Sequence, residues 1–435
     1  MNLRETLAAA WATPDLRGRI LFLFAMFTVY IIGIHIPVPV PGVDPEKVHD
    51  LIASNAALGF INLFGGGALK KLSIFALGLN PYITSSIVMQ LMTVGVPSLQ
   101  KMQREEGEYG RRKINRITRW LTIVLCFFQS WGYTKLITSL ASQAGASHLT
   151  FVDQLVIIAF WTAGAMFVLW LGEQIQEKGV GNGVSLMIFA GIIVQLPYQI
   201  HQLYQNLTIG QNSSLDVMLL AALFLGTIWI IVFFTQAQRR IPIHHMRRIP
   251  GRRAMGSQTV YLPLSINSAG VIPIIFAISL MYLPGTFAQA LGTGSPIGGF
   301  FATMQQLFSP GSSILGAAIY TLMIFGFTYF YTAVVYNVEE MADNLKRSGA
   351  FVPGVRPGSP TRDYLDGVIS RITLVGAAFL AFVALLQYWV PAWTNTINVF
   401  TLAGGTSLLI VVAVALDTMR QIESQVIMRG YEEVR

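Results

Sequence analysis

Charged side chains and cysteine are both scarce in this chain of 435 residues. Only 11% of the residues are charged, whereas 53% are hydrophobic, and the single cysteine is Cys126. A soluble domain typically carries roughly 25% charged residues, so the composition excludes an ordinary water-soluble protein. One cysteine also excludes a disulfide within the chain and a metal site made of several cysteines.

Recognisable catalytic motifs are missing as well. The sequence contains no HExxH, GxSxG, Walker-type loop or CxxC. Its six histidines are scattered, at His35, His49, His148, His201, His244 and His245. No nucleophile with a neighbouring base, and no pair of carboxylates, falls at membrane depth. We therefore predict no enzymatic activity, no cofactor and no metal, and keep an intramembrane enzyme only as a distant alternative.

Long apolar stretches are what the chain does contain. Ten of them have the length of a membrane-spanning helix. They lie at roughly 20–38, 73–95, 118–138, 153–172, 184–200, 216–236, 268–286, 315–336, 367–387 and 398–418. The stretch 184–200 is the weakest, because Pro197 shortens its apolar core. A helix closes its own backbone hydrogen bonds in lipid, so we predict an all-α membrane protein with ten transmembrane helices.

The positive charges predict the orientation of these helices. Of the 29 Lys and Arg residues, all but Lys47, Lys70, Lys71 and Lys135 fall on the side of the membrane that holds both termini. Positive residues accumulate on the cytoplasmic side. We therefore predict that both termini are cytoplasmic.

The block from Phe64 to Met92 reads FGGGALKKLSIFALGLNPYITSSIVMQLM and joins a glycine-broken apolar piece to a longer segment with scattered polar residues. Gly65, Gly66 and Gly67 have no Cβ, so the backbone there can take φ values closed to other residues and can hinge. This pattern suggests a channel with a movable stopper. The plainer interpretation is an interfacial loop followed by an ordinary spanning helix.

Six segments resemble, in order, those of the SecY-type channel subunits of the Sec translocon family. They are IPVPVPG, SIFALGLNPYITSSIVMQL, EQIQEKGVGNGVSLMIFAGI, LPLSINSAGVIPIIFA, GAFVPGVRPGSPT and FTLAGGTSLLIVVAVALD. The chain departs from the family pattern by a Val-Pro insertion near 37–41, by Leu79 and Asn80 where Ile-Met is usual, and by Ser265 in place of a frequent Lys.

This resemblance implies two pseudo-symmetric halves around a central pore with a short plug helix. The first half would be residues 1–200, with spans one to five and a plug near 57–69. The second would be residues 201–435, with spans six to ten and the cytoplasmic loops 237–267 and 337–366. The plug residues carried over are Phe60, Phe64, Gly65, Gly66 and Gly67.

The resemblance also implies a ring of aliphatic side chains at the waist of the pore. The matching residues are Ile83, Ile87, Val184, Ile188, Ile275 and Ile410. Without the resemblance, each of them would be taken as a lipid-facing or core residue. Ile83 and Ile87 are four residues apart, so they project from one face of a helix.

Two further sites follow from the same resemblance. A lateral gate between spans two–three and seven–eight would pass signal sequences into lipid, and its matching polar residues are Thr93, Gln129 and Asn267. These three equally suit ordinary contacts between helices. Basic cytoplasmic loops would contact ribosomal RNA or a motor ATPase, because arginine forks match phosphate. The arginines concerned are Arg239, Arg240, Arg252, Arg253 and Arg356, although positive-inside topology accounts for part of this charge.

We therefore predict a passive protein-conducting channel of the bacterial cytoplasmic membrane, which moves unfolded polypeptides across it and releases hydrophobic helices into lipid. The expected partners are SecE-type and SecG-type membrane subunits, a SecA-type motor ATPase, the ribosome, signal-bearing precursors and lipid. The main alternative is an ion- or solute-coupled secondary transporter. Such carriers usually place ionisable residues near mid-membrane, whereas the ionisable residues of this chain's spans fall at span ends.

Overall fold

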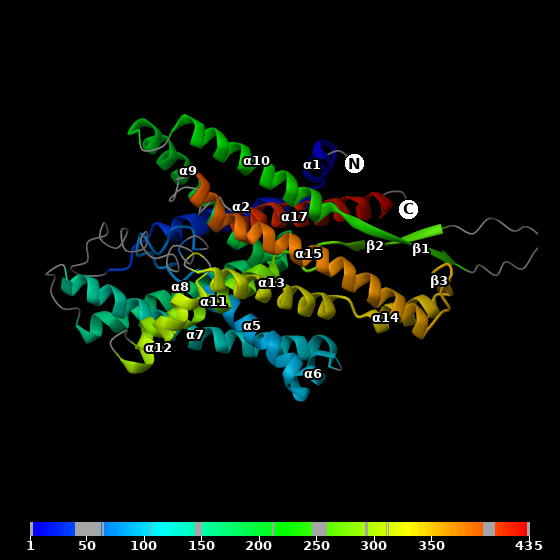
Figure 1. Cartoon of the computed structure of the whole chain (residues 1–435), viewed down its shortest axis with the longest axis horizontal. Helices are drawn as coiled ribbons and strands as arrows, with labels where there is room; N and C mark the ends of the chain where they lie inside the picture. Colours follow the sequence, from blue (N-terminus) through cyan, green and yellow to red (C-terminus); the bar gives the residue numbers. More distant parts are fainter. Residues whose placement is uncertain are drawn as a thin grey trace, which may run out of the picture. The chain divides into compact units, whose positions relative to one another are not determined.

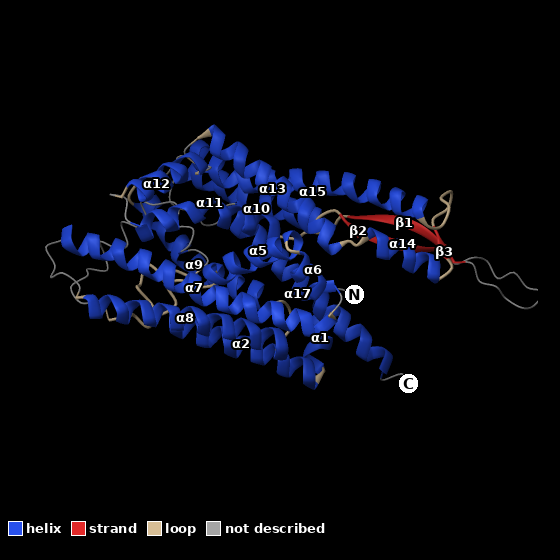
Figure 2. Ribbon diagram, turned by 90° about the horizontal axis from the view of Figure 1, so that it is seen from below, coloured by secondary structure: helices blue, strands red, loops and turns tan. Residues whose placement is uncertain are grey.

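The computed structural model describes residues 3–39, 62, 65–104, 106–143, 150–210, 213–245, 259–291, 295–309, 311, 313–394 and 405–432. Helices make up most of this part of the chain, and the strands form one small sheet (Figures 1 and 2).

The N-terminal part of the chain contributes eight described helices. They are α1 (Leu3–Ala12), α2 (Pro14–Ile34), α5 (Asn80–Gly95), α6 (Pro97–Arg104), α7 (Gly107–Gln143), α8 (Phe151–Lys178), α9 (Gly183–Thr208) and α10 (Ser214–Gln236). The remaining elements are β1 (Gln238–His245), β2 (Thr259–Ser265), α11 (Ile272–Leu291), α12 (Pro296–Phe308), α13 (Ile314–Val335), α14 (Val338–Arg347), β3 (Ala350–Phe351), α15 (Ser359–Thr394) and α17 (Gly405–Glu432).

A described helix covers most of each of the ten predicted spans. Among the described residues, seven helical stretches are long and apolar enough to cross a membrane, and the bent pair α5 and α6 would make an eighth. Pro197 lies inside α9 without ending it, so the weakest predicted span is a helix of 26 residues. These stretches confirm the prediction of an all-α, multi-pass membrane protein.

The helices group into two compact units. The first contains Met1–Ser213, Ile278–Ser313 and Val414–Arg435, and the second contains Ser214–Ala277 and Ile314–Ala413. Helices α11 and α17 therefore each contribute residues to both units.

The predicted second span begins as a helix later than expected. Residues 65–79, called the glycine segment below, form consecutive turns, and α5 starts only at Asn80. Gly78 has a φ of 55° and Leu72 a φ of 47°, which is the left-handed region that an α-helix cannot contain. At its other end α5 stops before Pro97, because the residue before a proline prefers extended backbone and Val96 has φ −111° and ψ 110°.

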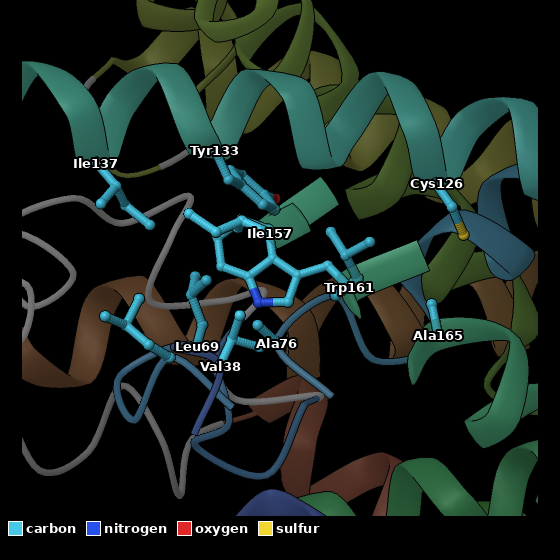
Figure 3. Close-up of a cluster of buried hydrophobic side chains, with 11 residues drawn as sticks. Val38, Leu69, Ala76, Cys126, Tyr133, Ile137, Ile157, Trp161 and Ala165 are labelled. Atoms are coloured by element: carbon cyan, nitrogen blue, oxygen red, sulfur yellow. The ribbon is translucent and has the colours of Figure 1, made fainter. Parts of the chain in front are cut away.

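A buried apolar cluster fixes the glycine segment inside the first unit. Trp161 of α8 lies in the middle of it and contacts Tyr133 of α7 edge-on, with ring centroids 6.4 Å apart. Figure 3 shows Leu69 and Ala76 of the segment on the other side of the Trp161 indole. The full cluster contains Val38, Leu69, Leu72, Ala76, Leu77, Cys126, Tyr133, Ile137, Ile157, Trp161 and Ala165.

The second unit holds the sheet, in the order β2-β1-β3. Strands β1 and β2 pair antiparallel from Gln238 opposite Ser265 to His244 opposite Thr259. The inward side chains Ile241 and Leu264 pack with Leu365 and Ile369 of α15, and Figure 2 shows the sheet beside α14 and α15. Residues of the two predicted loops, 237–267 and 337–366, therefore pack into one apolar core.

Candidate functional site

Of the three consecutive glycines Gly65, Gly66 and Gly67, the last two have the positive φ values that the sequence allows for. Gly66 has a φ of 68° and Gly67 a φ of 83°. A Cβ on Gly66 would lie 2.8 Å from Cδ1 of Ile34 and 3.3 Å from the Cα of Gly191. The segment therefore passes close to both α2 and α9, where a larger residue would not fit without displacement.

Hydrogen bonds attach the glycine segment to the end of α2. The Val38 amide donates to the Leu72 carbonyl at 2.9 Å, and the Ile74 amide donates to the Ile36 carbonyl at 3.0 Å. Beyond these backbone bonds, Lys71 Nζ lies 2.7 Å from Nε2 of His35. Burial lowers the pKa of the Lys71 amine from its usual value.

Two of the predicted plug residues, Phe60 and Phe64, lie outside the described residues. Of the predicted plug region, Asn62 and the stretch from Gly65 to Leu69 are described, and Asn62 and Leu69 are both buried.

Four of the six predicted ring residues belong to the first unit. On α5, Ile83 is 6% exposed and Ile87 is 2% exposed. On α9, Ile188 is 3% exposed and Val184 is half-buried. Asn182 starts α9 by accepting a hydrogen bond from the Ser185 amide at 3.2 Å, the usual N-cap arrangement, so the turn that carries Val184 has a defined beginning.

Ile275 and Ile410 belong to the second unit. Ile410 is 1% exposed and follows the first turn of α17. That turn packs on α15, because the Thr406 hydroxyl donates to Oε1 of Gln387 at 2.6 Å and a Cβ on Gly405 would overlap the Val383 carbonyl. Ile275 is 9% exposed and sits in the first turn of α11.

The three predicted gate residues have different surroundings. The Thr93 hydroxyl donates to the Gln90 carbonyl of its own helix at 2.7 Å. Both side-chain polar atoms of Asn267 are buried and have no hydrogen-bond partner among the described residues. Gln129 of α7 is half-buried and lines a small cavity.

That cavity lies in the first unit, between α5, α7 and the second half of α11, and has a volume of about 30 Å³. It is lined by Asn80, Thr84, Gln129, Tyr133, Ser279, Tyr282, Leu283 and Thr286. A space of this size with polar walls has room for about one or two water molecules. Asn80, one of the departures from the family pattern, therefore adds a polar side chain to this wall.

The described basic residues of the two loops that we predict to be cytoplasmic are exposed. Arg239 and Arg240 stand on β1, next to the buried Ile241. Arg356 lies in the turn after β3, where its carbonyl accepts a 2.8 Å hydrogen bond from Thr361 Oγ1. Gly354 and Gly358, on either side, have φ values of 83° and 106°, so this turn depends on glycine. Arg252 and Arg253 lie outside the described residues.

Sequence reasoning overlooked a buried polar contact between Asn62 and Gln195. Gln195 Nε2 donates a 2.7 Å hydrogen bond to the backbone carbonyl of Asn62. The available signal was a glutamine inside an apolar span, since polar residues at membrane depth usually have a partner. In the described part of the chain, no group of three or more His, Cys, Asp or Glu side chains could hold a metal ion.

Comparisons with known proteins agree with this geometry. The SecY family model matches residues 73–419. The chain is 40% identical to the protein translocase subunit SecY of Aquifex aeolicus over 99% of both proteins, and 42% identical to that of Pseudomonas aeruginosa over 97% of this chain and 93% of that one.

Solved structures share the fold at low sequence identity. A protein-conducting channel matches with a TM-score of 0.63 and 18% identity, covering 93% of this chain and 91% of that one. Sec61 from a canine ribosome-channel complex of the endoplasmic reticulum matches with a TM-score of 0.62 and 17% identity, covering the same shares of the two chains. The family model covers most of the chain and the relatives match it nearly end to end; the chain therefore belongs to the SecY family.

Proposed function

We propose that this protein is the channel subunit of a bacterial protein translocon, which conducts unfolded polypeptides across the cytoplasmic membrane and releases hydrophobic helices into lipid. The observation that carries this proposal is the 40% identity to a protein translocase subunit over 99% of both chains. Because this identity extends over nearly the full length, the match covers the spans, the glycine segment and the cytoplasmic loops.

Six aliphatic residues form the proposed constriction: Ile83, Ile87, Val184, Ile188, Ile275 and Ile410. All are β-branched, so they have few rotamers to lose when they close around an extended chain. A hydrophobic constriction also excludes ions by dewetting. A collar of this kind suits the passage of polypeptides with varied side chains, because it binds none of them specifically.

The polar lining of the membrane helices supports a passive channel over the ion-coupled carrier. Among the described residues, the buried polar side chains include Asn, Gln, Ser, Thr and Tyr, but no Asp, Glu, His, Lys or Arg is buried. Coupled carriers typically use Asp, Glu or His inside the membrane to bind an ion or a proton. The energy for transport would therefore come from outside the chain, from a SecA-type motor ATPase or the translating ribosome.

A movable gate is proposed at the polar seam around Gln129. The seam consists of side chains from α5, α7 and α11 that meet at the small cavity in the first unit. Thr93 and Asn267 are assigned to the gate by the family resemblance alone. Hydrogen bonds between membrane helices contribute only about 0.5–1.5 kcal/mol each. A signal helix that buries its own apolar face in the seam can displace contacts of that strength.

The proposed partners follow from the same assignment. Small membrane subunits of the SecE and SecG types would contact the lipid-facing helices. The ribosome or the motor would contact the exposed arginines of β1 and of the turn at Arg356. We further propose that both termini are cytoplasmic, as the distribution of Lys and Arg predicts.

Reconstitution tests the proposed function directly. The purified protein, combined with a SecE-type subunit in lipid vesicles, should import a signal-bearing precursor when motor ATPase and ATP are supplied. It should not accumulate small solutes against an imposed proton or sodium gradient. Gradient-driven solute uptake without precursor import would favour the carrier instead.

A further inference from the structure

One buried hydrogen bond joins α9 to the chain just before the glycine segment. Gln195 Nε2 donates to the backbone carbonyl of Asn62 over 2.7 Å. Gln195 is 8% exposed and Asn62 is 1% exposed. Water therefore does not compete for this contact, and the amide of Gln195 would lack this partner if Asn62 moved away.

Asn62 is also the point at which the glycine segment closes on itself. Its carbonyl accepts a second hydrogen bond, from the Gly67 amide at 2.9 Å. Its side-chain Oδ1 accepts one from the Lys70 amide at 3.0 Å. Holding Asn62 therefore holds both Gly67 and Lys70, and the contact from α9 fixes a folded turn and not a single residue.

The same face of α9 carries two of the proposed ring residues. Val184, Ile188, Gly191 and Gln195 are separated by four, three and four residues, so they lie along one face of the helix. Gly191 is the point where the backbone of α9 comes nearest to Gly66, because a Cβ added to Gly66 would be 3.3 Å from the Gly191 Cα. One helix face thus offers aliphatic side chains in its first turns and a hydrogen-bond donor two turns later.

We propose that Gln195 is a positioning residue, which holds Asn62 and the glycine segment against the face of α9 that carries Val184 and Ile188. The proposal rests on the proposed channel function and adds to it a specific residue that keeps the resting state closed. The contact is a single neutral hydrogen bond, so an incoming polypeptide can displace it. The Asn62 carbonyl keeps its hydrogen bond from the Gly67 amide after the Gln195 contact breaks. Breaking that contact therefore leaves no unsatisfied carbonyl, and the free-energy cost of release is small.

The test replaces the donor and keeps the size of the side chain. Gln195→Met has a similar length and no donor, and Gln195→Leu is a shorter apolar side chain that also has no donor. Gln199→Met is the matched control. Gln199 lies one turn further along α9 and is 2% exposed, but neither of its side-chain polar atoms has a hydrogen-bond partner among the described residues.

Two measurements on vesicles report the position of the segment. The first is the resting ion leak. The second is the rate at which a thiol reagent, added to both sides, modifies Ala68→Cys in a Cys126→Ala background, since Ala68 is fully buried in the segment. We expect Gln195→Met to raise both about fivefold, which corresponds to the loss of about 1 kcal/mol from one buried hydrogen bond. Gln199→Met should leave both at the parent level.

Equal effects of Gln195→Met and Gln199→Met would overturn the proposal, because general loosening of α9 would then suffice. Parent-like leak and labelling in Gln195→Met would overturn it as well. If the Met variant does not accumulate in membranes, Gln195→Leu decides by the same criteria. Precursor import by the parent vesicles is scored separately, so a failure of the channel function is distinguishable from a failure of this positioning role.

Discussion

Pro37 and Ser73 face each other in an isolated antiparallel bridge between the end of α2 and the glycine segment. On either side of this bridge, the Val38 amide donates to the Leu72 carbonyl and the Ile74 amide donates to the Ile36 carbonyl. Pro37 and Ser73 are therefore a non-hydrogen-bonded pair. Such pairs are the closer kind, with Cα atoms about 4.5 Å apart. A proline is tolerated there because its position requires no amide donor.

This bridge predicts a disulfide that leaves transport intact. Pro37→Cys with Ser73→Cys, in a Cys126→Ala background, has the Cα spacing that a disulfide needs, about 4.4–6.8 Å. Two backbone hydrogen bonds tie residues 72–74 to the end of α2, so we expect this part of the segment to stay in place while the part near Asn62 moves. Precursor import should then be the same in the oxidised and the reduced protein. Import is measured in vesicles before and after reductant, and gel mobility reports the fraction oxidised.

The single-cysteine variants are the controls for this experiment. Ser73→Cys alone matters most, because the Ser73 hydroxyl donates to the Gly33 carbonyl at 3.1 Å and accepts from the Phe75 amide at 3.0 Å. Import that stops on oxidation and resumes on reduction, in the double variant only, would mean that the whole glycine segment must move during transport.

Much of the fold could be predicted from the sequence. Apolar length alone located the helices, because lipid leaves no other way to satisfy the backbone. Length could not locate the start of α5, since Ser73 to Leu79 are as apolar as the helix that follows. Only the positive φ values at Leu72 and Gly78, and the pairing with residues 36–38, separate the turn from the helix.

The candidate site was less accessible to sequence reasoning. The faces of a helix can be inferred from residue spacing, and basic loops can be recognised from their composition. The exposed Arg240 and Arg356 agree with the second inference. The contact between Gln195 and Asn62 joins residues 133 positions apart, and no local pattern encodes it. The polar wall at Asn80 and Gln129 likewise requires α5, α7 and α11 to be packed before it exists.

Gly164 should be among the least replaceable residues of α8. A Cβ at this position would overlap the backbone carbonyl of Ile74 in the glycine segment. Gly164→Ala must therefore push the segment away from α8, and overpacking of this kind typically costs about 1–3 kcal/mol. We expect a lower thermal midpoint in detergent. Gly226→Ala on α10 is the control, because a Cβ added there would have nothing within 4 Å; equal midpoints for the two variants would contradict the packing argument.

Reversal of the exposed arginines should weaken ribosome binding. Arg240→Glu with Arg356→Glu places negative charge against phosphate, and the slope of log affinity against log salt should become shallower by about 0.7–0.9 for each phosphate that an arginine no longer neutralises. Binding to ribosomes is measured by co-sedimentation over a salt series. Arg240→Lys with Arg356→Lys keeps the charge and loses the bidentate fork, so its affinity should fall less. A double Glu variant with the parent's affinity and salt slope would leave these arginines as topology determinants only.

Replacement of a ring residue by asparagine should make the resting channel leak. Ile410 is almost fully buried at 1% exposure. An asparagine amide there can form hydrogen bonds with water, whereas an aliphatic constriction cannot and stays dry. Ile410→Asn should raise the ion conductance of reconstituted vesicles and permit import of a precursor with a defective signal sequence, whereas Ile410→Val, which keeps the surface apolar, should do neither. An unpaired buried amide also costs about 1–3 kcal/mol, so the thermal midpoint is measured in parallel, and Ile275→Asn at the less buried position serves as the second variant. If both Asn variants fold but keep the parent's conductance and its rejection of defective signals, neither residue lines the constriction.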